Sequence, residues 1–119
     1  MSGTAALKKI SGGVTAAKGF KAASTAAGIK YKDRKDMAMI YSEAPCRSAG
    51  TFTTNVVKAA PVKWDKNQVT GGAAAHAVVI NAGIANACTG EEGMEYCSRT
   101  AATAAPGLGI PPEGVLVAS

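Results

Sequence analysis

Short apolar runs separated by polar and turn-forming residues dominate the hydropathy pattern of this chain. Five runs are rich in Val, Ile, Met, Thr or aromatic side chains, the composition that is typical of β-strands. We predict strands at "DMAMIYS" (36–42, ended by Pro45), "AGTFTTNVV" (49–57), "APVKW" (60–64), "HAVVI" (76–80) and "VLVAS" (115–119). The segments "DKNQVTGG" (65–72) and "GIPPEG" (109–114) contain turn formers and are predicted to be connections.

One segment has a helical period instead, and we predict a helix over 90–105. Its apolar stripe consists of residues three or four positions apart: Met94, Cys97, Ala101 and Ala104. Thr89 stands three residues before Glu92, a spacing that fits a capping box at the start of a helix. The pair Pro106-Gly107 is predicted to end it.

The first 35 residues have little periodicity, so we expect a loop with short extended pieces at 20–23 and 28–31. They also hold eight of the thirteen basic residues, and the net charge of the chain is +5. Such a segment can attract anions, although a solvated basic surface is the more common explanation. Nucleic-acid binding usually needs aromatic side chains among the basic ones, and only Phe20 and Tyr31 are available here.

The length allows one domain at most, and the predicted strands and helix place it in the α/β class. At 119 residues, with many alanines and only 5% aromatic residues, the chain predicts a thin core of small side chains. The odd number of cysteines favours a reducing compartment, and no signal peptide is recognisable, so the cytoplasm is the expected location. No segment approaches the roughly 20 apolar residues of a membrane span.

The stretch "NAGIANACTG" (81–90) is predicted to be a strand–loop–helix junction. Asn81, Gly83, Asn86 and Gly90 are residue types that tolerate the backbone angles such a turn requires. A phosphate-binding loop would need GxGxxG or a Walker lysine, and both are missing from the stretch. A structural role is therefore favoured over direct ligand contact.

Considered one by one, the other reactive residues give only weak evidence for a catalytic or metal site. Cys88 near a helix start could act as a nucleophile, but it would need a histidine, and His76 is the only one. A hydrogen-bonded, partly buried His76 is the more common situation for a histidine that starts an apolar strand. One histidine and three scattered cysteines do not form a zinc site, so no metal ligands are assigned.

Five ordered blocks, taken together, resemble one family. The chain is similar to the ornithine acetyltransferases of arginine biosynthesis, which also act as glutamate N-acetyltransferases. The resemblance covers almost the whole chain and is carried by "SGGVTAAKGFKAA", "AAGIK", "AGTFTTNVVKAAPV", "NAGIANACTG" and "GIPPEGVLVAS". It implies the N-terminal portion of the self-processing acetyltransferase fold, an α/β layer with a mixed sheet and one packed helix, in which residues 1–119 form part of one domain.

The resemblance also implies a mechanism. Family members are longer precursors that cut themselves into two chains and expose a threonine nucleophile. That threonine takes an acetyl group from N-acetylornithine and passes it to glutamate, and bifunctional members also accept acetyl-CoA. A Thr-Gly pair that forms the oxyanion hole follows the block that resembles "VLVAS". On this alignment the chain stops just before that pair, so it holds no catalytic or substrate-binding residue, and alone it is expected to be inactive.

The expected contribution of this chain is a supporting loop at the edge of the active site, formed by Asn81, Gly83, Asn86, Thr89, Ala118 and Ser119. Its expected partners are the downstream segment or β chain, in a hetero-oligomer of α and β chains, and the two amino-acid substrates of the complete enzyme. Two alternatives remain at this point: a stand-alone basic module that binds anions, and a non-catalytic partner that assembles with a separate chain.

Overall fold

The computed structural model describes residues 6–30, 32–83 and 90–119. Its strands are β1 (Phe20–Thr25), β2 (Met37–Cys46), β3 (Ala75–Asn81) and β4 (Val115–Ala118). Its helices are α1 (Ala60–Thr70) and α2 (Gly90–Leu108), with short 3₁₀ turns at Val14–Ala16 and Pro112–Gly114. The strands at 76–80 and 115–119, the extended piece at 20–23 and the helix over 90–105 are thereby confirmed.

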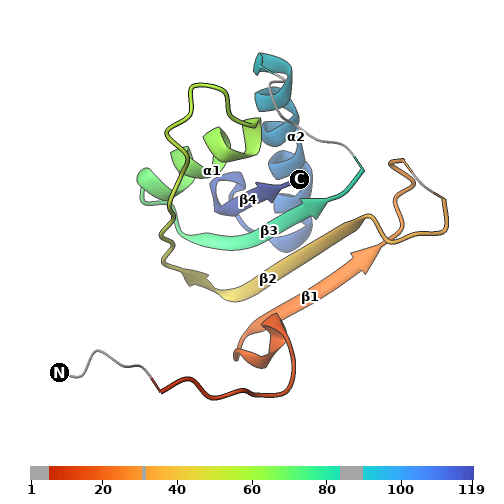
Figure 1. Ribbon diagram of the computed structural model, residues 1–119, viewed down its shortest axis with the longest axis vertical. Coiled ribbons are helices and arrows are strands. Elements are labelled where there is room, and N and C mark those ends of the chain that lie inside the picture. The colour runs from red at the N-terminus through yellow and green to blue at the C-terminus, as the bar shows by residue number, and fades with distance from the viewer. Residues whose placement is uncertain (1–5, 31, 84–89) are drawn as a thin grey trace.

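The four strands form one mixed sheet in the order β1-β2-β3-β4. β1 and β3 both pair antiparallel with β2, whereas β4 pairs in parallel with β3. Parallel neighbours need a long crossover, and α2 supplies it between β3 and β4 (Figure 1). The predicted α/β class with a mixed sheet is confirmed.

The strand that begins near Asp36 continues past Pro45, contrary to the prediction. The pairing of β2 with β3 shifts register between Tyr41 and Cys46, and Cys46 then lies opposite Ala75. Because proline has no N–H to donate to a ladder, it is tolerated where regular pairing is interrupted. The register shift therefore explains how Pro45 is accommodated.

The predictions for residues 49–72 were wrong. Residues 49–57 form no strand, and the segments assigned to a strand (60–64) and a turn (65–72) form the single helix α1. Pro61 lies in its first turn, where a missing N–H costs nothing because helix N-termini have unpaired N–H groups anyway. The predicted extended piece at 28–31 is also wrong for its described residues 28–30, which lie in a bend.

α2 passes through Pro106 and ends at Leu108, so Pro106-Gly107 is not its end. The terminator is Gly109, whose φ of 68° lies in the left-handed region. Ile110 N–H donates to Ala105 O at 3.1 Å and Gly109 N–H to Pro106 O at 3.3 Å, the two bonds of a Schellman motif. The helix thus stops where its carbonyls are capped.

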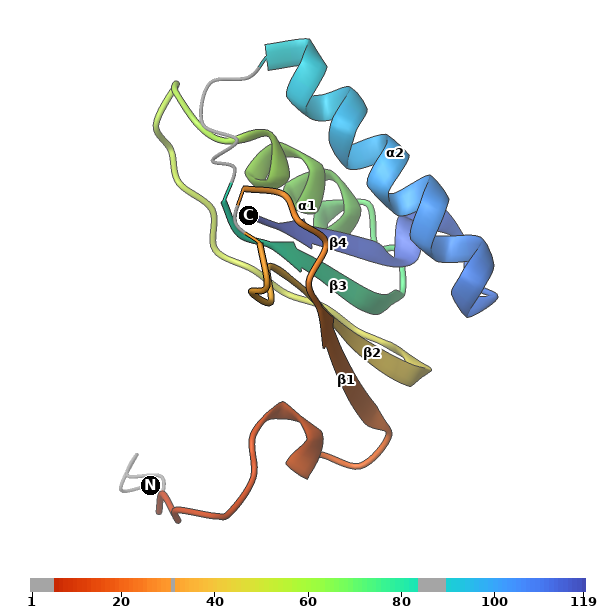
Figure 2. The ribbon, with the colours of Figure 1, turned by 90° about the vertical axis from the view of Figure 1, so that its right-hand side faces the viewer.

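The core lies between the two helices and one face of β3 and β4 (Figure 2). One cluster joins Val79 and Val115 to the α2 alanines, and a second joins Val117 to Ala60 and Cys97. Trp64 packs against both clusters. The largest fully buried side chains are only Val115, Val117 and Cys97, which confirms the predicted thin core.

Residues 6–19, which precede β1, run away from the sheet as an arm (Figures 1 and 2). Leu7, Ile10 and Val14 on this arm are exposed. The basic side chains of the first 35 residues are likewise exposed: Lys8, Lys9, Lys18, Lys21, Lys30, Lys32, Arg34 and Lys35. No helix in the described ranges has the length and apolar character needed to cross a membrane.

Candidate functional site

Four of the six predicted supporting residues lie at one edge of the sheet, where the parallel strands β3 and β4 end. Ile80 pairs with Ala118, so Asn81 and Ser119 follow neighbouring positions on the two strands. Gly83 lies two residues past the end of β3. Asn86 and Thr89, with Cys88, fall outside the described residues. We call this end of the sheet the carboxyl edge, defined by Asn81, Gly83, Ala118 and Ser119.

Asn81 joins the end of β3 to α2. Its side chain is buried, with only 5% of its surface exposed, and its Nδ2 donates to the Tyr96 hydroxyl at 3.4 Å. Its Oδ1 has no hydrogen-bond partner among the residues described. An unpaired buried acceptor is costly. Within the described part of the chain, this edge of the sheet therefore contains a buried acceptor without a hydrogen-bond partner.

Gly83 allows the chain to turn as it leaves the carboxyl edge. Its φ is +98°, a left-handed value that confirms the conformational reason for predicting glycine to matter here. A Cβ at this position would lie 3.0 Å from the Cβ of Lys30, closer than an ordinary contact. The turn after β3 and the loop before β2 are therefore packed against each other.

Asp36 holds that loop in place, and sequence analysis had assigned it no role. Its carboxylate accepts N–H bonds from Ala27 at 2.6 Å and Ile29 at 2.8 Å, and these two bonds hold its pKa below the ordinary value. Its own carbonyl accepts the N–H of Ala82 at 2.9 Å. Asp36 thus joins both loops to the carboxyl edge. The only signal in the sequence was an acidic residue directly before an apolar run.

A cavity of about 390 Å³ opens beside the end of β4, on the side of α1. The loop before α1 contributes Thr51 and Thr53, the helix contributes Asp65, and β4 leads into it with Ser119. Asp65 Oδ1 accepts the N–H of Val117 at 2.9 Å. Burial raises the pKa of Asp65 to about 6, although its bond to Val117 acts in the opposite direction.

The remaining reactive side chains are engaged in structural contacts. Cys97 is fully buried, and burial followed by the nearby charge of Asp65 raises the pKa of its thiol. His76 Nδ1 lies 3.1 Å from Ser42 O and its ring stacks on Tyr41, which confirms the partly buried, hydrogen-bonded histidine. Across the described ranges, no three His, Cys, Asp or Glu side chains are grouped to hold a metal ion.

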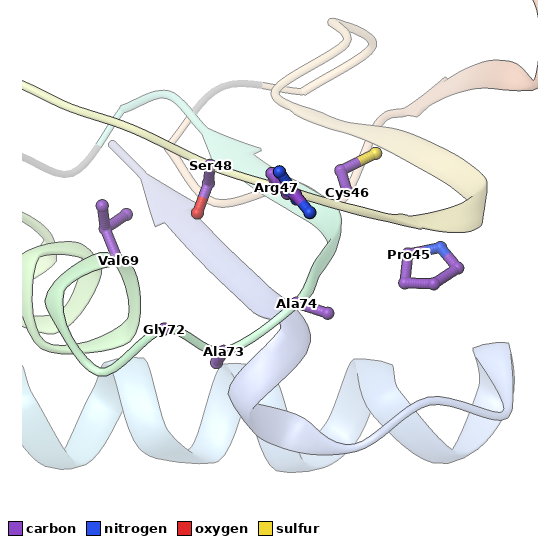
Figure 3. Close-up of a pocket in the computed structure, with 8 residues that line it drawn as sticks. All are labelled: Pro45, Cys46, Arg47, Ser48, Val69, Gly72, Ala73 and Ala74. Atoms are coloured by element: carbon purple, nitrogen blue, oxygen red, sulfur yellow. The ribbon is translucent and has the colours of Figure 1, made fainter.

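A second cavity of about 390 Å³ lies at the opposite end of the sheet (Figure 3). The chain that leaves β2 forms one wall with Cys46, Arg47 and Ser48, and the link from α1 to β3 forms the other with Gly72 to Ala74. Cys46 Sγ lies 3.1 Å from the Ser42 hydroxyl. This cavity is separated from the carboxyl edge by the length of β3.

Two solved structures have the same fold. The crystal structure of the arginine biosynthesis bifunctional protein argJ from Bacillus halodurans matches with a TM-score of 0.82 and 40% identity, over 89% of this chain and 55% of that one. The crystal structure of ornithine acetyltransferase complexed with ornithine, from Mycobacterium tuberculosis, matches with a TM-score of 0.76 and 41% identity, over 90% and 59%. The fold is therefore that of the arginine-biosynthesis acetyltransferase class.

Sequence comparison agrees with the structural match. A family model described as the ArgJ family matches residues 21–119. The arginine biosynthesis bifunctional protein ArgJ of Gloeobacter violaceus is 50% identical over 110 residues, and that of Thermosynechococcus vestitus is 46% identical over 112. These matches cover 92% and 94% of this chain but 27% of each relative. The chain belongs to the ArgJ family, and it spans about a quarter of the length of these relatives.

Proposed function

We propose that residues 1–119 form the N-terminal part of an acetyltransferase domain that moves an acetyl group from N-acetylornithine to glutamate. Membership of the ArgJ family supports the arginine-biosynthesis role, and one structural match is named for ornithine acetyltransferase in complex with ornithine. The observation that carries the proposal is the carboxyl edge, where two parallel strands pair up to Ile80 and Ala118, directly before Asn81 and Ser119. In open α/β sheets, ligands commonly bind outside the carboxyl ends of the strands.

The proposed reaction is a covalent acyl transfer. A threonine hydroxyl, on the segment that follows this chain in the complete enzyme, attacks the acetyl carbonyl of N-acetylornithine. The C–N bond breaks, the leaving amine takes the proton, and an acetyl-threonine ester remains. The amine of glutamate then attacks the ester, the C–O bond breaks, and the proton that the amine loses returns to the threonine hydroxyl. Both steps pass through an oxyanion that needs positioned hydrogen-bond donors.

The proposed contribution of this chain is scaffolding. β4 carries the main chain to Ser119, and a Thr-Gly oxyanion pair would follow there in the complete enzyme. Asp36 and Gly83 hold the two loops beside it. The proposed partners are therefore the downstream segment or β chain and the two amino-acid substrates. Acetyl-CoA is a further possible acetyl donor in bifunctional members.

Reading the coding sequence past Ser119 and assaying its full-length product would test the proposal. We expect the frame to continue into Thr-Gly and then to a threonine preceded by small residues. The product should transfer acetyl from N-acetylornithine to glutamate and form an acetyl-enzyme detectable by mass spectrometry. Residues 1–119 alone should transfer none. A full-length product without acetyl transfer, or transfer by the 119-residue chain, would overturn the proposal.

A matched pair of measurements separates the two alternatives. Co-purification with a separate chain that begins in Thr-Gly would favour the non-catalytic assembly partner. Binding to anions that weakens steeply with added salt would instead favour the basic module, whose exposed arm carries Lys8, Lys9 and Lys18.

A further inference from the structure

The outer edge of β4 faces a helix and not another strand. β4 is the last strand of the sheet, so the main-chain groups on its outer side have no ladder partner. Two consecutive side chains of α1 bond to two of these groups. Trp64 Nε1 donates to Val115 O at 2.9 Å, and Asp65 Oδ1 accepts from Val117 N–H at 2.9 Å.

These two bonds fix the strand at alternate residues. Val115 and Val117 are also fully buried on the helix side, with 0% and 1% of their surface exposed, so packing and hydrogen bonding act on the same residues. Of the two bonds, the one to Asp65 lies nearer the carboxyl edge. It therefore acts most directly on the position of Ala118, the last residue of β4, and of Ser119, which follows it.

Asp65 is suited to this role and also makes it dependent on protonation. Val117 N–H of β4 donates to its carboxylate, and the charge of the carboxylate acts on the Cys97 thiol of α2. Thr51 and Thr53 of the preceding loop line the same cavity, and among the described residues no lysine or arginine lines it. An ionised carboxylate is a stronger acceptor than a neutral one. Protonation of Asp65 therefore weakens its hydrogen bond with the Val117 N–H.

We propose that Asp65 is a positioning residue for acetyl transfer, because its hydrogen bond to Val117 N–H sets where the chain leaves β4 beside the cavity. The inference rests on the proposed function. In this proposal Asp65 acts through the main chain of β4. A displacement of about 1 Å in an oxyanion donor is enough to slow an enzyme by up to about 100-fold.

The test compares Asp65→Asn and Asp65→Ala in the full-length gene product that contains this chain, with Lys63→Ala on the exposed side of α1 as the control. Asparagine keeps a hydrogen-bond acceptor but has no charge, and alanine removes the acceptor as well. For the parent, kcat should decline as pH falls through about 6. Asp65→Asn should lack this inflection, whereas Asp65→Ala should lower kcat about tenfold or more at pH 7.5 with KM changed little.

The control variant should match the parent at every pH. Catalytic rates are normalised to the folded fraction measured by circular dichroism, so that a loss of stability alone does not move kcat. An inflection near pH 6 that persists in Asp65→Asn, or a kcat of Asp65→Ala within about twofold of the parent, would overturn the inference. An inactive parent would instead contradict the proposed function.

A second measurement does not depend on the reaction. In the 119-residue chain, hydrogen exchange at the Val117 amide should be slow in the parent and in Asp65→Asn. In Asp65→Ala it should be about tenfold faster or more, because the amide loses its acceptor. Equal protection of the Val117 amide in the parent and in Asp65→Ala would show that Asp65 does not hold β4.

Discussion

The indole Nε1 of Trp64 donates a hydrogen bond to the carbonyl of Val115 at 2.9 Å, joining residues 51 positions apart in the sequence. Through this bond, α1 covers the outer side of β4, where no further strand pairs. Trp64 also packs against both core clusters, so it serves two purposes at once. It is the only tryptophan of the chain, and its fluorescence should therefore report directly on the α1–β4 contact.

Trp64→Phe tests the hydrogen bond separately from the packing. Phenylalanine keeps most of the apolar contact but leaves the Val115 carbonyl without its donor, so we expect a loss of about 1–2 kcal/mol in the free energy of unfolding. Trp64→Ala should lose about 3–5 kcal/mol. Urea unfolding followed by far-UV circular dichroism measures both. A phenylalanine variant as stable as the parent would show that the bond contributes nothing.

Gly83→Ala should destabilise the protein by about 1–2 kcal/mol, since alanine at a positive φ is strained. The new Cβ would also lie 3.0 Å from that of Lys30. Gly107→Ala is the matched control, because it lies within α2 with no atom within 4 Å of the added Cβ. The control should raise stability by about 0.5–1 kcal/mol. Thermal unfolding distinguishes the two, and equal shifts would contradict the strain argument.

Asp36 should stabilise the protein only while it is ionised. Its pKa in the folded protein lies below the ordinary 3.8, so its contribution is complete above that value and is lost as pH falls through the folded pKa. Asp36→Asn should therefore be less stable than the parent at pH 7, and the difference should shrink in acid. Melting temperatures from pH 7 to pH 2 measure this. A difference that is constant with pH would rule out a role for the charge.

Ionisation of Asp65 should have the opposite effect on folding stability, in a different range of pH. Its folded pKa of about 6 lies above the ordinary 3.8, so its contribution to stability falls as pH rises between these two values. Asp65→Asn should abolish that fall and be at least as stable as the parent above pH 6. Unfolding by urea at pH 4, 5, 6 and 7 gives the slope. A parent whose stability rises across this range, with no change in the variant, would contradict the assignment.

Cys97 should resist alkylation in the folded protein. The side chain is fully buried and burial raises its pKa, so little thiolate is present or accessible. In a Cys88→Ser background, iodoacetamide should label Cys46 at least about tenfold faster than Cys97. Mass spectrometry of peptides at timed intervals gives the two rates, with urea-unfolded protein as the control in which they should become similar.

The sequence predicts best where the burial pattern is simple. β3 and β4 are apolar runs, and the stripe of α2 includes its buried Cys97 and Ala101, so these elements are confirmed. α1 was missed because few of its residues are fully buried, namely Ala60 and Pro61, whereas Trp64 and several others are half-buried. Its residue Asp65 faces β4 despite being polar, and that direction breaks the pattern of apolar inward positions on which a helix prediction depends.

The carboxyl edge could be predicted only in part. Gly83 was assigned from its residue type, and its positive φ agrees. The roles of Asp36 and Asp65 depend on backbone N–H groups at Ala27, Ile29 and Val117, which only the folded chain brings close. Asn86 and Thr89 lie outside the described residues, and their supporting role stays a prediction.

The position of β4 in the chain also determines when this fold can form during synthesis. Val115 and Val117 complete both core clusters, yet they are among the last five residues of the 119. A nascent chain can pair β1 with β2 early, because they are close in sequence. The helices can contact each other and Val79 of β3 before that point, but neither core cluster is complete until β4 has left the ribosome. Until then the faces of α1 and α2 that bury Val115 and Val117 stay open to solvent, and this is when a chaperone would be most useful.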